Sequence, residues 1–281
     1  MGRYDMFQAI RAGARKSDLT IDNLSALGLD DSTRSLHILW MYPDVLEMHG
    51  DRGNVMALLH YSNLLQLPCT IRKCNTLLEE IPFDWADMIY FPSGDLACMQ
   101  DVSNALQPRK ADFERFAAEG KAVIAIASTG ALLARKVTML NGNSFVGLGL
   151  LNMEMAQRKT VFGDDLWFET ENGLKVIGNE IQTADTRLGE GQAPLGRVIY
   201  GRGNCGDGYE GARSGAVIFT HTTGPVFARN PRFTEAVLKG CAAHAGLAWS
   251  AETHSLSDED IALELAANRD FETFIRSKQQ Q

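Results

Sequence analysis

Apolar and polar residues alternate along this chain in a pattern that predicts strands separated by helices. From residue 36 onward, short apolar runs rich in β-branched and aromatic side chains are each followed by a longer segment with apolar residues every three or four positions. Helices between strands carry the chain back across a sheet, so this alternation favours a parallel sheet in a doubly wound α/β fold. We predict strands at residues 36–42, 69–74, 87–92 and 121–127, and helices at residues 53–67, 95–106, 109–119 and after residue 130.

The pattern changes beyond residue 147, where apolar runs become shorter and are separated by Gly, Asn and Asp. Such runs predict an antiparallel or mixed addition to the sheet. A closing helix should follow with Pro231 in its first turn, where proline is well tolerated. The later runs lie at residues 166–170, 174–181, 196–201 and 215–220, and helical periodicity returns after residue 258.

These patterns divide the chain into three parts. Residues 1–34 contain a short amphipathic stretch at residues 5–16 and a polar segment, so we predict an N-terminal extension there. Residues 35–246 form the predicted α/β domain, and residues 247–281 form a helical tail.

The amino-acid composition argues against several kinds of binding partner and cellular location. The formal charge of −8 and the pI near 5.3 argue against a protein that binds the phosphate backbone of nucleic acids. The sequence contains no run of eighteen apolar residues and no secretory leader, so we expect a cytoplasmic protein without a membrane span. Five cysteines without a CxxC pair fit a reduced compartment, and scattered histidines predict no metal site.

The stretch "KAVIAIASTGALLARK" at residues 121–136 predicts a strand that bends sharply into a helix. Such a bend exposes its side chain at the carboxyl edge of the sheet, beside the amides of a helix N-terminus, which is where many α/β enzymes carry a nucleophile. The bend here consists of Ala127, Ser128, Thr129 and Gly130.

Four segments of the chain carry glycine-rich turns in a distinctive order. They are "YPDVLEMHGDRGNVMAL" (42–58), "DMIYFPSGDLACMQ" (87–100), "FVGLGLLNM" (145–153) and "GRGNCGDGYEGARSGAVIFTHTTGPVFARNP" (201–231). In this order they resemble class I glutamine amidotransferase-like domains of the cobyric acid synthase type, most closely the GatD-type glutaminase subunits of lipid II isoglutaminyl synthases. The resemblance implies a flavodoxin-like, mostly parallel sheet flanked by helices.

The resemblance also implies where a site would lie. Gly94 and Asp95 match the loop that carries the oxyanion-hole amide, and Thr129 and Gly130 follow the elbow as further binding residues. In the family, a catalytic Cys stands at the elbow and a catalytic His stands directly before a Gly-Pro pair. The present chain has Ala127 and Thr223 at those two positions.

These departures change the expected chemistry. Glutamine hydrolysis needs a thiolate to attack the amide, a histidine to move the proton and amides to hold the oxyanion. A methyl group and a hydroxyl group supply neither of the first two, so we hypothesise that normal glutaminase chemistry is lost. The resemblance further implies a partner, a Mur ligase-like synthetase that uses ATP. We expect this chain itself to bind glutamine or another small amide, and we expect no bound cofactor.

Two alternatives remain open at this stage. Ser128 could replace the nucleophile with His221 as its base, although Ser128 and Thr129 also suit capping of the elbow helix. The chain could instead be a non-catalytic binding or regulatory subunit. Elsewhere, Asp51, Arg52 and Asn54 could form a turn and a helix cap, or contact a ligand or partner subunit, and Glu210 and Arg213 could form an ion pair.

Overall fold

The structure, a computed structural model, describes residues 20–77 and 79–279, so the amphipathic stretch predicted at residues 5–16 lies outside the described residues. The strands are β1 (Thr20–Asp22), β2 (Leu36–Met41), β3 (Cys69–Cys74), β4 (Met88–Phe91), β5 (Ala122–Ile126), β6 (Lys136–Thr138), β7 (Ser144–Phe145), β8 (Met153–Thr170), β9 (Lys175–Leu188), β10 (Gly196–Tyr200), β11 (Tyr209–Glu210), β12 (Ala212–Ser214), β13 (Val217–Thr220) and β14 (Thr222–Thr223). The α-helices are α2 (Arg52–Leu64), α3 (Met99–Leu106), α4 (Lys110–Ala118), α5 (Gly130–Leu133), α6 (Val226–Arg229), α7 (Pro231–His244) and α8 (Ala262–Gln279). Short 3-10 helices are η2 (Ser25–Leu27), η3 (Leu96–Cys98), η4 (Gln107–Arg109) and η5 (Ala127–Thr129).

The main sheet has seven strands in the order β1-β3-β2-β4-β5-β13-β12. Its five central strands are parallel, and β1 and β12 pair antiparallel at the two edges. Numbered along the chain, the parallel strands follow the flavodoxin-like order 2-1-3-4-5, in which ligands bind beyond the carboxyl ends of the strands. This confirms the predicted fold class.

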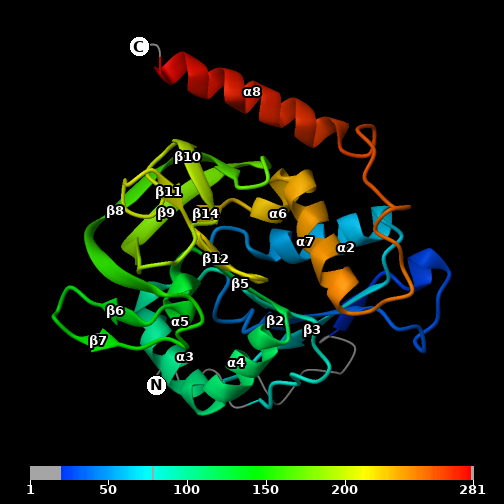
Figure 1. Cartoon of the computed structure of the whole chain (residues 1–281), viewed down its shortest axis with the longest axis horizontal. Helices are drawn as coiled ribbons and strands as arrows, with labels where there is room; N and C mark the ends of the chain where they lie inside the picture. Colours follow the sequence, from blue (N-terminus) through cyan, green and yellow to red (C-terminus); the bar gives the residue numbers. More distant parts are fainter. Residues whose placement is uncertain (1–19, 78, 280–281) are drawn as a thin grey trace.

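Alternate residues of the central strands face two separate cores. Leu39, Ile89 and Val123 belong to the core shared with α3, α4 and α5, whereas Ile38 and Met88 belong to the core shared with α2 and α7. Figure 1 shows these helices on the two sides of the sheet. Because both faces of the strands are covered, their sequences are continuous apolar runs rather than alternating ones.

A second sheet, in the order β11-β10-β8-β6-β7, stands beside the first, with the long strand β9 paired along β8. The predicted antiparallel strands are present, but most of them form this separate sheet instead of extending the main one. The run at residues 215–220 contributes β13, which pairs parallel with β5 in the main sheet. Only the short β14 that follows it crosses to β9, through Thr222 and Thr223.

Both described ends of the chain pack on this framework. β1, within the predicted N-terminal extension, adds an edge strand to β3. At the other end, α8 runs along the second sheet (Figure 1), where Phe271 and Ile275 form a small cluster with Trp167 and Ile177. The boundaries at residues 34 and 246 remain predictions.

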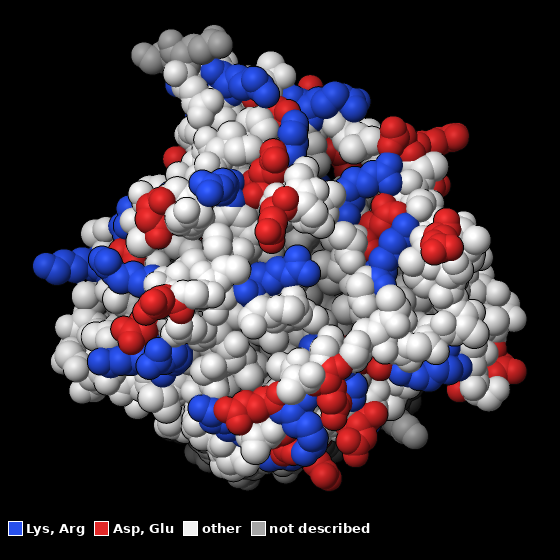
Figure 2. Space-filling view, in the orientation of Figure 1, with Lys and Arg blue, Asp and Glu red and all other residues white. Residues whose placement is uncertain are grey.

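The surface carries charges of both signs. On the face shown in Figure 2, basic and acidic side chains are interspersed over the described elements. Within residues 20–77 and 79–279, no helix combines the length and the apolar character that a membrane crossing requires.

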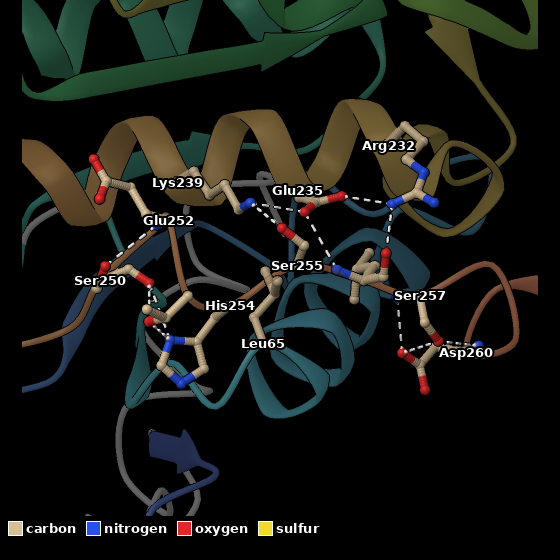
Figure 3. Close-up of polar contacts among 12 residues, drawn as sticks. Leu65, Arg232, Glu235, Lys239, Ser250, Glu252, His254, Ser255, Ser257 and Asp260 are labelled. Atoms are coloured by element: carbon tan, nitrogen blue, oxygen red, sulfur yellow. Dashed lines mark hydrogen bonds and ion pairs between the residues drawn. The ribbon is translucent and has the colours of Figure 1, made fainter.

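Polar contacts fix the connection between α7 and α8. Glu235 of α7 is 8% exposed and bonds Arg232 and Lys239, at 3.0 and 2.9 Å, and it accepts the backbone N–H of Leu256 at 3.3 Å (Figure 3). Burial alone would raise the pKa of Glu235, but the bonds from Lys239 and Arg232 outweigh it and hold that pKa below its usual range. The carboxylate therefore stabilises this connection in its charged form.

We expect Glu235→Gln to lower the free energy of unfolding at pH 7 by about 1.5–3 kcal/mol, the typical value of hydrogen bonds to a charged group. Because the pKa is lower in the folded chain, the stabilisation is complete above the ordinary Glu pKa and is lost as the pH falls through the folded value. Denaturant unfolding at several pH values should show the difference between wild type and variant shrinking as the pH falls below the ordinary Glu pKa. Glu252→Gln, an exposed change in the same connection, should have little effect. A constant difference down to pH 3 would contradict the ion-pair account.

Candidate functional site

The predicted bend is present and strained. β5 ends at Ile126, and Ala127 has a φ of +52°, in the left-handed region that costs a non-glycine residue about 1–2 kcal/mol. η5 and α5 follow at once. This strand, strained turn and helix form the geometry of a nucleophile elbow. The residue at its apex, which is 6% exposed, carries a methyl group.

Two glycines allow the elbow to pack closely. A Cβ atom on Gly130 would lie 2.3 Å from a ring carbon of Phe219, on the neighbouring strand β13. A Cβ atom on Gly94 would lie 2.6 Å from the Leu46 side chain. Both distances are far shorter than a van der Waals contact, so a larger residue would force the Phe219 ring to move at position 130 and the Leu46 side chain to move at position 94.

Ser128 bonds across to the loop after β4. Its hydroxyl accepts a hydrogen bond from the Gly94 N–H at 3.1 Å and donates one to the Gly94 carbonyl. Asp95, beside it, accepts the N–H of Ala97 at 3.0 Å and begins η3. The structure therefore brings together the elbow and the Gly-Asp loop, through a contact that the sequence pattern did not indicate.

The predicted capping of the elbow helix holds for Thr129 only: its side chain bonds the backbone at the N-terminus of η5, whereas Ser128 caps neither η5 nor α5. The Thr129 hydroxyl accepts the N–H of Ile126 at 3.0 Å and lies 2.8 Å from the Ile126 carbonyl and 3.2 Å from that of Phe91. Thr129 is fully buried and ties the start of the elbow helix back to the end of the strand.

His221 and Thr223 are both buried and bonded to β9. His221 is 2% exposed, and its Nε2 lies 3.0 Å from the Thr186 hydroxyl. Burial lowers its pKa to about 3, so the ring is neutral. The Thr223 hydroxyl donates to the Asn179 carbonyl at 2.9 Å. The His221 ring thus bonds β9 and the Ser128 hydroxyl bonds Gly94. No hydrogen bond connects His221 with Ser128.

The predicted ion pair between Glu210 and Arg213 is wrong. Glu210 is fully buried, and one of its oxygens accepts the Thr220 hydroxyl and the His221 N–H, both at 2.7 Å. Arg213 is exposed and donates to the Gly215 carbonyl. Burial raises the pKa of Glu210 to about 8, and the nearby carboxylate of Glu180 adds to this.

Asp51 connects the loop before α2 to the Gly94 loop. It is fully buried, accepts the N–H of Ser93, and accepts the Asn54 side-chain amide at 2.8 Å. Asn54 in turn accepts the N–H of Phe227 at 2.8 Å, just beyond Thr223. The predicted turn is present, since the Asn54 N–H bonds the Asp51 carbonyl at 2.9 Å, but Asp51 makes no side-chain cap on α2 and the predicted cap is wrong. The pair instead joins three loops that surround the elbow.

Sequence reasoning missed Ser93, Asn179 and Glu180. Ser93 donates its backbone N–H to Asp51 and its hydroxyl to the Met48 carbonyl, contacts between loops that lie more than forty residues apart in the chain. Asn179 and Glu180 reach the site because β9 pairs with β14, and that pairing depends on register. The one available signal was Glu180 itself, a charged residue inside an apolar strand run.

The sequence model of the CobB/CobQ-like glutamine amidotransferase domain matches residues 37–231. The chain belongs to this family. It is also 25% identical over 198 residues to the lipid II isoglutaminyl synthase (glutamine-hydrolyzing) subunit GatD of Streptococcus pneumoniae, a match that covers 69% of this chain and 76% of that protein.

Solved structures of glutamine amidotransferases resemble the chain at lower identity. One is 17% identical, with a TM-score of 0.46, and the match covers 75% of this chain and 99% of that one. Another, from Thermotoga maritima, is 10% identical, with a TM-score of 0.47 and coverage of 76% and 99%.

In this member of the CobB/CobQ-like family, four of the five thiols are poorly suited to replace a nucleophile. Burial raises the pKa of Cys69, Cys74 and Cys241 to about 12, so they stay protonated at neutral pH. Burial and the neighbouring Asp207 raise the pKa of Cys205 as well. Among the residues that the structure describes, no group of three or more His, Cys, Asp or Glu could hold a metal ion.

The strain at Ala127 predicts an unusual response to glycine. We expect Ala127→Gly to leave stability unchanged or to raise it by up to about 1 kcal/mol, because relief of the left-handed φ offsets the backbone entropy of glycine. Ala125→Gly, two residues earlier in extended strand, should instead cost about 1–2 kcal/mol. Denaturant unfolding of both variants checks the contrast, and equal losses would argue against a strained elbow.

Asp51→Asn should destabilise the loops around the elbow. The amide that replaces one carboxylate oxygen cannot accept, so either the Ser93 N–H or the Asn54 amide loses its partner, at a cost of about 1–3 kcal/mol. Hydrogen exchange at Ser93, Gly94 and Phe227 should accelerate together. Asp44→Asn, an exposed change in the same loop, is the control. Acceleration confined to α2 would favour a capping role instead.

Proposed function

We propose that this chain is the amidotransferase-like subunit of a two-subunit ligase that amidates a peptidoglycan precursor, and that it no longer hydrolyses glutamine. The likeness to a lipid II isoglutaminyl synthase subunit supports the first part. One observation carries the second: Ala127 occupies the apex of the strained elbow, where a nucleophile would stand.

The surroundings of Ala127 support the loss of hydrolysis. An acyl transfer needs a nucleophile and a base within hydrogen-bond reach of each other. The described alternatives are engaged elsewhere, since Ser128 bonds Gly94 and His221 bonds Thr186. His221 is also a weak base, because burial lowers its pKa to about 3. Thr223 holds the backbone of β9.

The proposed role is therefore that of a non-catalytic binding or regulatory subunit in the cytoplasm. Its partner would be a Mur ligase-like synthetase that uses ATP, as the resemblance to GatD-type subunits implies. The closely packed glycines and the buried contacts of Asp51 and Asn54 support this role. They stabilise the loops around the elbow, and a binding subunit needs that surface to be ordered even if it catalyses no reaction.

Purified protein should release no glutamate from glutamine above the heat-denatured control, either alone or with a candidate Mur ligase-like synthetase. Ser128→Ala should not change this result, because the hydroxyl is not the nucleophile in our proposal. Robust turnover that Ser128→Ala abolishes would overturn the proposal and show that Ser128 has taken over the chemistry.

A tagged form of the full chain, isolated from its native cells, should retain a Mur ligase-like synthetase that mass spectrometry identifies. If that synthetase, supplied pure, shows no association by sedimentation, the proposed pairing fails even when hydrolysis is absent.

A further inference from the structure

The Ser128 hydroxyl accepts a hydrogen bond from a backbone N–H that, in an elbow site, would be free to bind the ligand. In elbow sites, a carbonyl oxygen is held by backbone N–H groups from the residue after the apex and from a neighbouring loop. Here the neighbouring loop follows β4, and its Gly94 N–H points at Ser128 Oγ, 3.1 Å away. The same hydroxyl donates to the Gly94 carbonyl.

Both partners of this contact are saturated. A serine hydroxyl has a single proton, and Ser128 gives it to the Gly94 carbonyl. The Gly94 N–H has a single hydrogen, and it goes to Ser128. A ligand carbonyl could use this N–H only after the hydroxyl had turned away, which would also leave the buried Gly94 carbonyl without its donor.

The structure holds the two sides of the contact in place. Ser128 is 8% exposed, and the next residue, Thr129, bonds the backbone of Ile126. On the other side, Asp51 holds the N–H of Ser93, the residue before Gly94. The contact therefore joins two fixed backbones.

We propose that Ser128 is a plug that closes the former oxyanion site to carbonyl ligands. Restoring a thiol at position 127 and an imidazole at position 223 would then not suffice for recognition of glutamine, and Ser128 would also have to change. This inference rests on the proposed function, since it assumes that the elbow site no longer works.

The test uses the full chain with Ala127→Cys and Thr223→His, with and without Ser128→Ala. Two reagents alkylate the introduced thiol. A chloromethyl ketone analogue of glutamine needs its carbonyl to be recognised, whereas iodoacetamide does not. In each reaction the thiolate displaces halide and forms a thioether, which intact mass spectrometry measures. Their rate ratio therefore isolates recognition from thiol reactivity.

We expect Ser128→Ala to raise this ratio at least tenfold. The matched control is Ser103→Ala in α3, which removes another buried hydroxyl, bonded at 2.6 Å to the Val146 carbonyl, and should leave the ratio unchanged. If the ratio of the two alkylation rates is the same with and without Ser128→Ala, the proposal is wrong. It is also wrong if Ser103→Ala raises the ratio as much as Ser128→Ala does.

A second measurement does not depend on the introduced residues. In the otherwise unaltered chain, Ser128→Ala should accelerate hydrogen exchange of the Gly94 amide at least tenfold, while exchange in α4 stays constant. Unchanged protection at Gly94 would overturn the proposal. Glutamate release by the unaltered chain would instead overturn the proposed function, so the two failures are distinguishable.

Discussion

The buried carboxylate of Asp51 is the interaction on which the arrangement around the elbow depends. It holds the N–H of Ser93 and the side chain of Asn54, and Asn54 holds the N–H of Phe227. Through two side chains, the loop after β2, the loop after β4 and the loop after β14 become one unit. β2 and β4 are neighbours in the main sheet, whereas β14 pairs with β9 in the second sheet, so the two side chains link loops from both sheets.

Close packing adds to this unit. A Cβ atom on Gly53 would lie 2.6 Å from the Pro225 ring, so the start of α2 can approach the loop after Thr223 only because residue 53 is glycine. Gly94 and Gly130 play the same part against Leu46 and Phe219. The glycine-rich segments of the sequence therefore preserve backbone approach, which a site needs whether or not it still performs a reaction.

The sequence predicted the parallel core well because its strands are buried on both faces, which leaves continuous apolar runs such as β2 and β5. It also predicted the bend at Ala127. It placed β13 with the later strands, because a local pattern does not encode which strand will be its neighbour. It failed for side-chain partners: Ser128 was expected at a helix N-terminus and Glu210 beside Arg213, yet both bond groups brought near by tertiary packing.

The buried glutamates change how the charge of the protein should be counted. The formal value of −8 treats every carboxyl group as ionised. Burial raises the pKa of Glu210 to about 8 and that of Glu180 to about 7, so at neutral pH the first keeps its proton and the second keeps about half of one. With those two protons counted, the folded chain carries a net charge between about −7 and −6 at pH 7. Unfolding releases these protons, about one and a half in total at pH 7, so folding takes up protons in this pH range. Part of the net charge of the protein is therefore set by its fold and not by its composition alone.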